Sequence, residues 1–367
     1  MVSRRAVLGG LPLAGLAVSS ETRAAVLRPS ILGSGSESLR TLAAQRGLVY
    51  GSAACTYQLR DRDFVAALTR EAGALVPEYE LKRDAIERSR GQFDFSACDT
   101  LVDFARARAM SVRGHTLVWY HSNPAWLEEA VLDWRDSGLL TGYIGSVVTH
   151  FRGRITSWDV VNEAIAPDDG RKDSLRESFW LKAFGPGYID EAYHAARAAD
   201  PDALLVYNDW GCEAGEPKND RFRAATLGFL EGALARGVPI QALGLQGHLS
   251  AFGPQIDQRK LSRFLDDVES LGLRVLVTEH DVDDTGGPSE MAERDRKVAD
   301  ASRRFLDVIL PHRATVAVLT WGLTDRFLDA PGWRQRLTGY TPRKLPLDPD
   351  LGRTPMWQAI AASLANV

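Results

Sequence analysis

The sequence predicts an α/β protein: a single domain folded as a (β/α)8 barrel. Short runs of β-branched and apolar residues alternate eight times with longer amphipathic runs, the pattern of parallel strands joined by helices. Uncommon polar side chains collect where these strands should end. Two of the strands end in a glutamate, at Glu163 and Glu279. Because the site of such a barrel forms at the carboxyl ends of its strands, these residues mark a candidate site.

The first 24 residues are expected to lie outside this domain. Arg4 and Arg5 precede an apolar run of small residues from 6 to 18, which polar residues and the small pair Ala24-Ala25 follow. This arrangement is typical of an export signal, and the paired arginines indicate the bacterial twin-arginine route. A membrane anchor is the alternative, but the run is shorter than a bilayer span requires. We therefore expect cleavage after residue 24 and a periplasmic or secreted protein without membrane attachment.

The composition excludes several classes of protein. The chain has 367 residues, 45% of them hydrophobic and 25% charged, with a net charge of −4, as in an ordinary globular protein with a large core. The negative charge and the lack of a basic block after the N-terminus argue against nucleic-acid and anionic-membrane partners. Cys55, Cys98 and Cys212 are too scattered for a disulfide framework or a zinc site, and they allow one bridge or buried free thiols.

The elements are expected to alternate from residue 48 onward. Enrichment in β-branched and apolar residues predicts strands at 48–53, 74–78, 111–118, 155–162, 203–207, 242–246, 274–279 and 316–321. Helical periodicity predicts helices at 62–72, 96–109, 137–150, 174–199, 220–236, 257–271, 290–310 and 354–364. Residues 25–46 are expected to form an N-terminal extension, and residues 47–367 to form the barrel domain.

A doubly wound open sheet is the alternative arrangement for such an alternation. It predicts a glycine-rich phosphate-binding turn after the first strand. The residues found there are Ala53-Ala54-Cys55-Thr56, which include no glycine. No internal repeat or low-complexity linker is evident in the chain, so we expect one TIM barrel without an appended binding module.

Polar residues mark the ends of seven of the eight predicted strands. They are Glu78, Glu80 and Lys82 at the second strand, His115 and Trp119 at the third, Asn162 and Glu163 at the fourth, Asn208, Asp209 and Trp210 at the fifth, Gln246 and His248 at the sixth, Glu279 and Asp281 at the seventh, and Trp321 and Asp325 at the eighth. Any one of them alone is more often a packing or surface residue. Their shared position indicates one site at the carboxyl end of the barrel.

Six motifs give the chain a resemblance to a known family. They are GHTLVW (114–119), WDVVNEA (158–164), YND (207–209), LGLQGH (243–248), VTEHDV (277–282) and TWGLTD (320–325). In this order they resemble the glycoside hydrolase family 10 endo-β-1,4-xylanases, over nearly the whole chain after the signal. The resemblance implies retaining hydrolysis of β-1,4-xylosidic linkages in xylan without a cofactor. It also implies that Glu163 is the general acid/base and Glu279 the nucleophile.

The chemistry explains why two carboxyl groups are needed. A retaining glycosidase holds them roughly 5–5.5 Å apart across the scissile bond, one to attack the anomeric carbon and one to protonate the leaving oxygen. Glu163 must therefore begin each turnover protonated and Glu279 ionised. Once the glycosyl-enzyme has formed, Glu163 takes a proton from water, so its role reverses within each turnover.

The resemblance also implies roles for neighbouring residues. Asn162 is expected to bind the sugar 2-hydroxyl, and His248 with Asp281 to hold Glu279 in place. The expected substrate-binding residues are Glu78, Lys82, His115, Trp119, Asn208, Gln246 and Trp321. Tryptophan beside amide and lysine side chains suits a sugar, which presents C–H faces as well as hydroxyls.

Five residues depart from the family's pattern. Tyr79 replaces an asparagine that binds the second sugar upstream of the cut, and Tyr120 stands where histidine is common. Trp210-Gly211 replaces a common Tyr-Asn pair, and Asp329 stands where a second tryptophan usually covers the site. These changes leave the two glutamates intact and alter the walls of the site.

Other functions remain open on the sequence. A retaining β-glycanase of the same barrel type would act on β-glucan or aryl cellobiosides, and a non-catalytic carbohydrate-binding barrel would need neither glutamate. A metallohydrolase is disfavoured because the seven histidines lack ligand spacing. We predict no metal site, although Asp168-Asp169 and Asp283-Asp284 lie in loops where a structural calcium would be compatible. The expected partner of a monomeric chain is xylan or a xylo-oligosaccharide.

Overall fold

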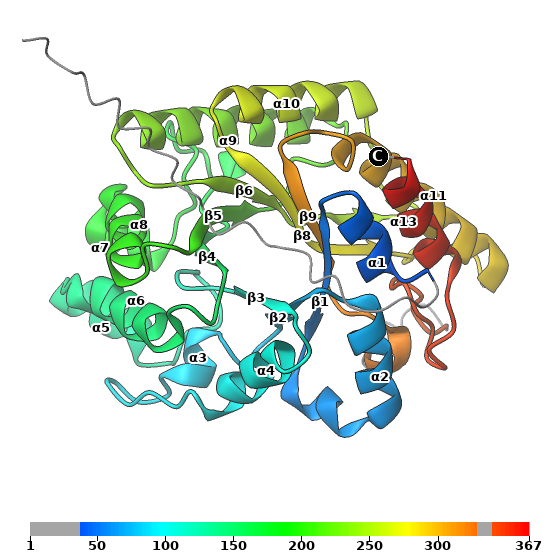
Figure 1. Ribbon diagram of the computed structural model, residues 1–367. Coiled ribbons are helices and arrows are strands. Elements are labelled where there is room, and N and C mark those ends of the chain that lie inside the picture. The colour runs from blue at the N-terminus through cyan, green and yellow to red at the C-terminus, as the bar shows by residue number, and fades with distance from the viewer. Residues whose placement is uncertain (1–36, 329–339, 367) are drawn as a thin grey trace, which may run out of the picture.

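The computed structural model describes residues 37–328 and 340–366, which form a closed parallel barrel surrounded by helices (Figure 1). The barrel wall consists of β1 (Val49–Ala54), β2 (Ala74–Pro77), β3 (Ser111–Gly114), β4 (Ser157–Asn162), β5 (Leu204–Asp209), β6 (Ala242–Leu245), β8 (Arg274–Asp283) and β9 (Thr315–Thr320). Each strand pairs in parallel with its neighbours, and the pairing of β9 with β1 closes the ring. The (β/α)8 fold predicted from the sequence is thus confirmed.

The strands depart from the predicted boundaries near the end where the site was expected. A short additional strand, β7 (His248–Ser250), pairs with the second half of β8 and places His248 opposite Asp281. This partner lets β8 continue to Asp283 instead of ending at residue 279. The predicted strand 111–118 ends instead at Gly114, and the following residues reach β4 through a single bridge between Val118 and Val161.

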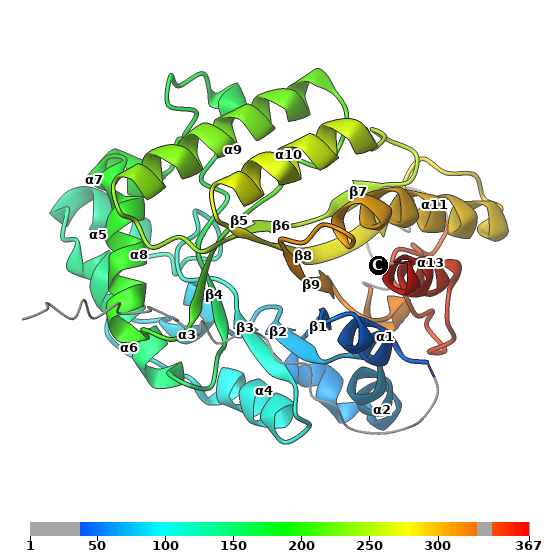
Figure 2. The same cartoon turned by 45° about the horizontal axis from the view of Figure 1, so that its top comes forward.

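Helices cover the outside of the barrel and connect its strands (Figure 2). They are α1 (Leu39–Gln45), α2 (Arg62–Glu71), α3 (Arg83–Ile86), α4 (Ser96–Arg106), α5 (Leu127–Trp134), α6 (Gly138–Phe151), α7 (Phe179–Phe184), α8 (Gly187–Ala199), α9 (Pro217–Ala235), α10 (Gln258–Ser270), α11 (Met291–Ile309) and α13 (Pro355–Ala365), with 3-10 turns η1 (Thr56–Arg60), η2 (Pro167–Asp169) and η3 (Asp325–Phe327). The predicted helix 174–199 is split at Gly185-Pro186. Gly185 has a φ of 67°, and proline fits only at a helix start, so one helix ends there and another begins.

The core has an inner and an outer part. Inside the barrel lie small and branched side chains from the strands: Val49, Ala53, Ala74, Val76, Leu204, Val206, Ala242, Leu276, Ala317 and Leu319. A larger apolar layer fills the space between the strands and the helices, each of which buries one face. Helix α10, for example, begins at the capping residue Asp257 and buries Leu261 and Phe264. The interior is therefore packed, and the carboxyl end of the barrel is where a site can open.

The two ends of the described chain meet on one side of the barrel. Helix α1 lies beside α13 (Figures 1 and 2), and Arg46 Nη2 donates to the carbonyl oxygen of Ala365 at 2.6 Å. Glu71 on α2 is fully buried and accepts hydrogen bonds from the backbone N–H of Leu39 and from Trp357 Nε1. One carboxylate therefore joins the first, second and last helices.

Cys55, Cys98 and Cys212 are buried free thiols. Among the described residues, no helix combines the length and the apolar character needed to cross a lipid bilayer. The predicted export signal and Asp329 lie outside the described residues.

Candidate active site

A cavity of about 660 Å³ opens at the carboxyl end of the barrel. Both Glu163 and Glu279 line it. So do eight of the other residues expected at the site: Lys82, His115, Trp119, Asn162, Gln246, His248, Asp281 and Trp321. The structure therefore brings residues from strands far apart in the sequence to one place, and leaves only Glu78 and Asn208 away from the lining.

Glu163 adopts an uncommon backbone conformation. Its φ is 57°, in the left-handed region that costs a non-glycine residue about 1 kcal/mol or more. Two hydrogen bonds hold this turn: the Glu163 N–H donates to Asn208 O at 2.9 Å, and the Glu163 carbonyl accepts from Arg176 Nε at 2.6 Å. The chain thus leaves β4 sharply, and the Glu163 side chain reaches the cavity.

The carboxylate of Glu163 has partners on both sides. Its Oε1 accepts from Gln246 Nε2 at 2.9 Å. The Tyr120 hydroxyl also forms a hydrogen bond with Glu163, and the Arg176 guanidinium lies 4.5 Å from the centre of the Tyr120 ring. Arg176 therefore supports Glu163 twice, through its carbonyl oxygen and through Tyr120.

A second buried carboxyl lies near Glu163. Asp209 is fully enclosed and accepts hydrogen bonds from the backbone N–H groups of Ile165 and Trp210. Burial raises the pKa of Asp209 to about 7; a hydrogen bond from Tyr207 opposes the increase, and the charge of Glu163 adds to it. The negative charge of Glu163 therefore disfavours ionisation of Asp209.

Glu279 is held as an anion. Its Oε1 accepts from Asn208 Nδ2 at 2.7 Å, its Oε2 lies 3.2 Å from His248 Nε2, and His115 Nδ1 lies 3.8 Å from Oε1. Burial alone would raise the pKa of Glu279, but interactions with His115, His248 and Asn208 outweigh burial and lower it to about 2. Glu279 is therefore ionised at neutral pH, the state that a carboxylate nucleophile requires.

A chain of charged groups continues behind Glu279. His248 Nδ1 lies 2.8 Å from Asp281 Oδ1, and Lys344 Nζ forms an ion pair with Asp281 Oδ2. Burial disfavours protonation of His248, but Asp281 and Glu279 outweigh it and raise the pKa of the imidazole. Burial likewise would raise the pKa of Asp281, whereas His248 and Lys344 hold it well below its usual range. A protonated imidazole between two carboxylates has a fixed orientation.

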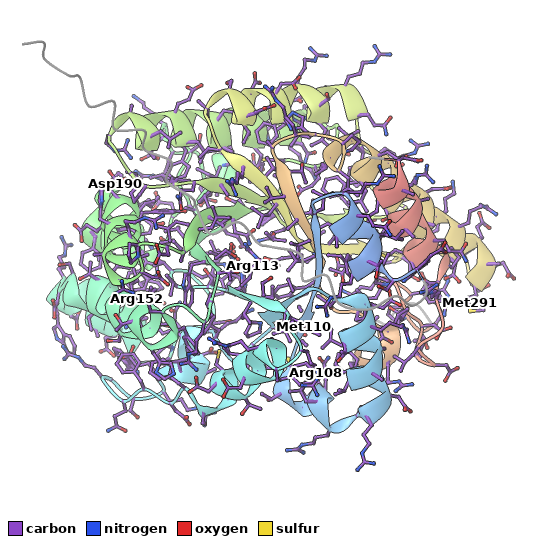
Figure 3. All side chains as sticks on the ribbon, viewed as in Figure 1. Arg108, Met110, Arg113, Arg152, Asp190 and Met291 are labelled. Atoms are coloured by element: carbon purple, nitrogen blue, oxygen red, sulfur yellow. The ribbon has the colours of Figure 1, made fainter. Side chains whose placement is uncertain are left out.

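His115 is held by an ion pair inside the barrel. Figure 3 shows Arg113 among the strands near the middle of the molecule, whereas Arg152 and Asp190 lie on the helical layer. Arg113 Nη2 donates to Asp159 Oδ1 at 2.5 Å, and Asp159 Oδ2 lies 3.0 Å from His115 Nδ1. All three side chains are buried. The imidazole of His115 is thereby kept at a fixed position beside Glu279.

Two tryptophan rings give the cavity an apolar wall. Lys82 Nζ lies 4.8 Å from the centre of the Trp119 ring and 5.7 Å from that of Trp321. Trp180 Nε1 donates to the Trp119 carbonyl at 3.0 Å and so fixes the start of this wall. Flat apolar faces beside charged and amide groups match the C–H faces and hydroxyls of a pyranose ring.

Asn208 differs from the expectation that it binds substrate. The side chain is fully buried: its Nδ2 donates to Glu279 and also lies 2.9 Å from Asn162 Oδ1, and its Oδ1 accepts from Thr278 Oγ1 at 2.6 Å. The Asn208 side chain thus does not line the cavity, and its hydrogen bonds connect it to Glu279, Asn162 and Thr278. The amide of Asn162 can accept from Asn208 in one orientation and from Trp119 Nε1, at 3.3 Å, in the other.

Glu78 also lies outside the cavity lining. Its Oε2 is 3.7 Å from Cys55 Sγ, and burial raises the pKa of the Glu78 carboxyl, an effect that Lys82 and Lys344 oppose. The structure therefore does not bring Glu78 into the cavity lining, and its contact with a sugar stays a prediction.

Two of the residues that depart from the family's pattern, Tyr79 and Gly211, can be located in the structure. Tyr79 is 48% exposed, and its hydroxyl donates to Asp84 at 3.1 Å. Gly211 adopts a φ of 91° and donates its N–H to the buried Glu213 at 2.8 Å. A side chain on Gly211 would meet Phe222 at 2.8 Å, so glycine permits this close approach.

Two supporting residues have no signal in the sequence. Lys344 and Arg176 lie outside the six motifs and away from the strand ends. Each acts through a residue that does belong to a motif, Lys344 through Asp281 and Arg176 through Glu163. An alternation of strands and helices does not indicate such contacts, because loops bring them together.

The aspartates considered for calcium are engaged elsewhere. Asp168 Oδ1 lies 2.7 Å from Arg221 Nη2, and Asp284 forms a buried ion pair with Arg294. Within the described part of the chain, no group of histidine, cysteine and acidic side chains has the arrangement of a metal site.

The fold and the cavity together define the class of protein. A parallel (β/α)8 barrel with two buried glutamates beside tryptophan rings carries the groups that a retaining glycoside hydrolase uses. Comparison with known families gives the particular one: residues 38–363 match the model described as Glycosyl hydrolase family 10. The chain belongs to this family, whose members are hydrolases that use two glutamates with retention of configuration.

Named relatives agree with this membership. The chain is 34% identical over 310 residues to endo-1,4-beta-xylanase B of Thermotoga neapolitana. This match covers 83% of this chain and 86% of the relative. The structure of native xylanase 10B from Thermotoga maritima is similar with a TM-score of 0.79 and 31% identity, covering 90% of this chain and 98% of that one. The structure of xylanase 10B from Thermotoga petrophila RKU-1 in complex with xylobiose has a TM-score of 0.79 and 30% identity. The match covers 91% of this chain and 99% of that one.

Proposed function

We propose that this protein is a retaining endo-1,4-β-xylanase, which cleaves internal β-1,4-xylosidic linkages of xylan. The observation that carries the proposal is that Glu163 and Glu279 line one cavity, with Asn208 Nδ2 and His248 Nε2 at 2.7 and 3.2 Å from the Glu279 carboxylate. Family membership and relatives named as endo-1,4-beta-xylanases support xylan as the substrate. The complex of the related Thermotoga petrophila enzyme with xylobiose supports binding of a xylo-oligosaccharide in this cavity.

In the first step, Glu279 attacks the anomeric carbon while Glu163 donates a proton to the leaving glycosidic oxygen. The C–O bond to the leaving sugar breaks as the bond to Glu279 forms, so a covalent glycosyl-enzyme results. Asn208 and His248 hold the attacking carboxylate at 2.7 and 3.2 Å, and it therefore starts from a fixed position.

In the second step, Glu163 takes a proton from a water molecule that attacks the same carbon and releases Glu279. The charge of Glu279 is absent from the glycosyl-enzyme, which favours the ionised form of Glu163 that this step needs. We assign to Asn162, the residue before Glu163, the contact with the sugar 2-hydroxyl, which strengthens towards the oxocarbenium-like transition state.

Substitution of the two glutamates tests the proposal. We expect Glu279→Ala to lower kcat on xylan and on an aryl β-xylobioside by roughly 10³-fold or more, because no nucleophile remains. We expect Glu163→Ala to lower hydrolysis of xylan similarly but to spare the first step on an aryl xylobioside, whose phenolate leaves without a proton. Added azide should then yield the β-configured glycosyl azide.

Glu129→Ala serves as the control, since Glu129 is exposed on α5 and lies outside the cavity. Near wild-type hydrolysis by either catalytic variant would overturn the assignment. Binding of xylan by the wild-type protein without any cleavage would instead favour a carbohydrate-binding barrel.

A second substrate class is retained because of Tyr79. This exposed ring stands where the family has an asparagine for the second sugar, so the glycone side is altered. The alternative is a retaining β-glycanase acting on β-glucan or aryl cellobiosides. Comparison of kcat/KM on xylan, β-glucan and aryl cellobioside decides between them, and a preference for either glucan substrate would favour the alternative.

We further propose that residues 1–24 are a twin-arginine export signal and that the mature protein is a monomeric, secreted or periplasmic barrel domain. The paired Arg4 and Arg5 before a short apolar run support this proposal. Replacing both arginines by lysine should leave the protein in the cytoplasm of a bacterial host, as cell fractionation would show. Unchanged export would contradict it.

A further inference from the structure

Lys344 lies far from the other site residues in the sequence but close to them in the fold. It belongs to the segment that precedes α13 and lines the same cavity as Glu279. Three backbone contacts fix this segment. The N–H groups of Lys344 and Leu345 donate to Asp325 Oδ1 at 3.0 and 3.1 Å, and the Lys344 carbonyl accepts from Val282 N at 3.3 Å.

The side chain of Lys344 completes a line of alternating charges. Its ammonium pairs with Asp281 Oδ2, Asp281 Oδ1 lies 2.8 Å from His248 Nδ1, and His248 Nε2 lies 3.2 Å from Glu279 Oε2. The side chains of Lys344 and Asp281 are 15% and 7% exposed, so water screens their attraction only weakly. Each member of the line therefore restricts the position of the next.

We propose that Lys344 is a positioning residue for the nucleophile: by holding Asp281, it orients His248 and keeps the Glu279 carboxylate in a fixed position. The inference rests on the proposed function, because it assigns Lys344 to the reaction in which Glu279 attacks. Without Lys344, one oxygen of a buried carboxylate would lose its cation, and Asp281 could turn away from His248. The effect would reach Glu279 through the imidazole.

Several other charged groups share this region and contribute to its pH dependence. Those that face Lys344, His248 or Glu279 are Glu78 and Lys82 after β2, His115 after β3, Glu163 after β4, Glu213 after β5, Asp281 and Asp283 on β8, and Asp325 and Arg343 beside the segment. Removal of the Lys344 ammonium takes one positive charge from the region. The remaining carboxylates then bind protons more readily, and Glu279 loses its ionised form at a higher pH than in the wild-type protein.

The experiment compares Lys344→Met and Lys344→Arg with Lys260→Met. Lys260 is a matched control because it also pairs with an aspartate, Asp220, at 2.7 Å, but outside the cavity. We would measure kcat and KM on an aryl β-xylobioside from about pH 2, the pKa of Glu279, to about pH 8, so that the acid limb of kcat/KM, which reports ionisation of the nucleophile, falls inside the measured range. The good leaving group removes the need for a proton from Glu163.

We expect Lys344→Met to lower kcat roughly 10-fold or more, the size typical of a lost supporting contact, with little change in KM. The acid limb should move to higher pH by about half a unit or more. Lys344→Arg should bring kcat and the acid limb back towards the wild-type values, because arginine keeps the positive charge. Lys260→Met should have the kcat and acid limb of the wild-type protein. Melting temperatures identify variants that fail to fold, in which case Lys344→Arg carries the comparison.

Two results would overturn the inference. An unchanged kcat and acid limb in folded Lys344→Met would show that Asp281 is held without Lys344. A higher KM with an unmoved acid limb would show that Lys344 binds the sugar directly. Wild-type activity in the same assay tests the proposed function separately: if the wild-type protein does not cleave the xylobioside, the proposed function fails before the variants are compared.

Discussion

At the scale of single residues, two amides tie the glutamates together. Asn208 accepts from the Glu163 N–H with its backbone oxygen and donates to Glu279 with its side chain. Gln246 donates to Glu163 with its side chain and accepts from the Glu279 N–H with its backbone oxygen. The separation of the two carboxylates is therefore controlled by the same two residues, which lie at the ends of neighbouring strands.

The first prediction concerns Tyr120, which stands where the family commonly has histidine. Burial raises the pKa of the Tyr120 hydroxyl, and the charge of Glu163 and a hydrogen bond with its carboxylate add to the increase. We expect Tyr120→Phe to lower kcat on xylan by about 2- to 10-fold, the effect of one lost hydrogen bond to the acid/base carboxyl.

Steady-state rates on xylan as a function of pH test this expectation. Tyr57→Phe is the matched control, since Tyr57 is 53% exposed and packs on Phe327 outside the cavity. An unchanged kcat in Tyr120→Phe across the pH range would mean that the hydroxyl does not influence Glu163.

The sequence was informative about the chemical residues and less so about their support. Glu163, Glu279, His248 and Asp281 were placed together because each lies at a strand end. Asn208 was expected at the substrate, yet the structure buries it behind Glu279. Successive residues of a strand face opposite sides, and the sequence around residue 208 does not determine which side points to the cavity.

At the scale of single elements, strand β6 shows how a glycine makes room for the site. A Cβ atom on Gly244 would lie 2.4 Å from Asn208 Oδ1 and 2.9 Å from Thr278 Cγ2. We expect Gly244→Ala to displace the Asn208 amide from Glu279. The variant should lose about 1–3 kcal/mol of stability through overpacking, and kcat should fall more than KM changes.

Gly228→Ala on α9 is the matched control, because a Cβ there meets no atom within 4 Å. It should leave kcat unchanged and raise the free energy of unfolding by about 0.5–1 kcal/mol, because alanine is favoured over glycine inside a helix. Urea unfolding and initial rates measure both quantities. If Gly244→Ala matched Gly228→Ala in both, the close contact with Asn208 would have no influence on the site.

Two features that we did not predict from the sequence, strand β7 and the break between α7 and α8, have physical explanations. Strand β7 is three residues long and exists because β8 offers a pairing edge beyond Val277, a tertiary contact without a local signal. The break between α7 and α8 did carry a signal, since Gly185-Pro186 is a pair that ends helices. The regular strands and helices were predicted from periodicity because one face of each is buried by the same barrel.

At the scale of the whole molecule, the third prediction concerns acid stability. His280 is fully buried, with Nδ1 2.9 Å from Gly247 O and Nε2 2.9 Å from Ser302 Oγ. Burial lowers the pKa of His280 to about 4, whereas an unfolded chain gives about 6.5. The unfolded state therefore binds this proton more tightly. The contribution of His280 to the free energy of unfolding is fully present above pH 6.5. It is lost as the pH falls from 6.5 towards 4, and the total loss is about 3 kcal/mol.

Urea unfolding of the wild-type protein between pH 4 and 7, compared with His280→Asn, measures this contribution. The variant should be less stable at pH 7, because it loses packing, but its free energy of unfolding should depend less on pH in that window. Equal slopes in the two proteins would show that another group causes the acid sensitivity.

Because α1 and α13 lie side by side, the barrel contacts do not require the chain to begin at α1. Since β1 pairs with β9 and Glu71 joins α1, α2 and α13, a short peptide could connect residue 366 to residue 37 in a chain that starts at the first described residue. A circularly permuted chain, opened instead at the exposed Asp136 between α5 and α6, would keep these contacts in a different order. Its melting temperature beside that of the parent would report how far the fold depends on contacts alone and how far on the order of synthesis.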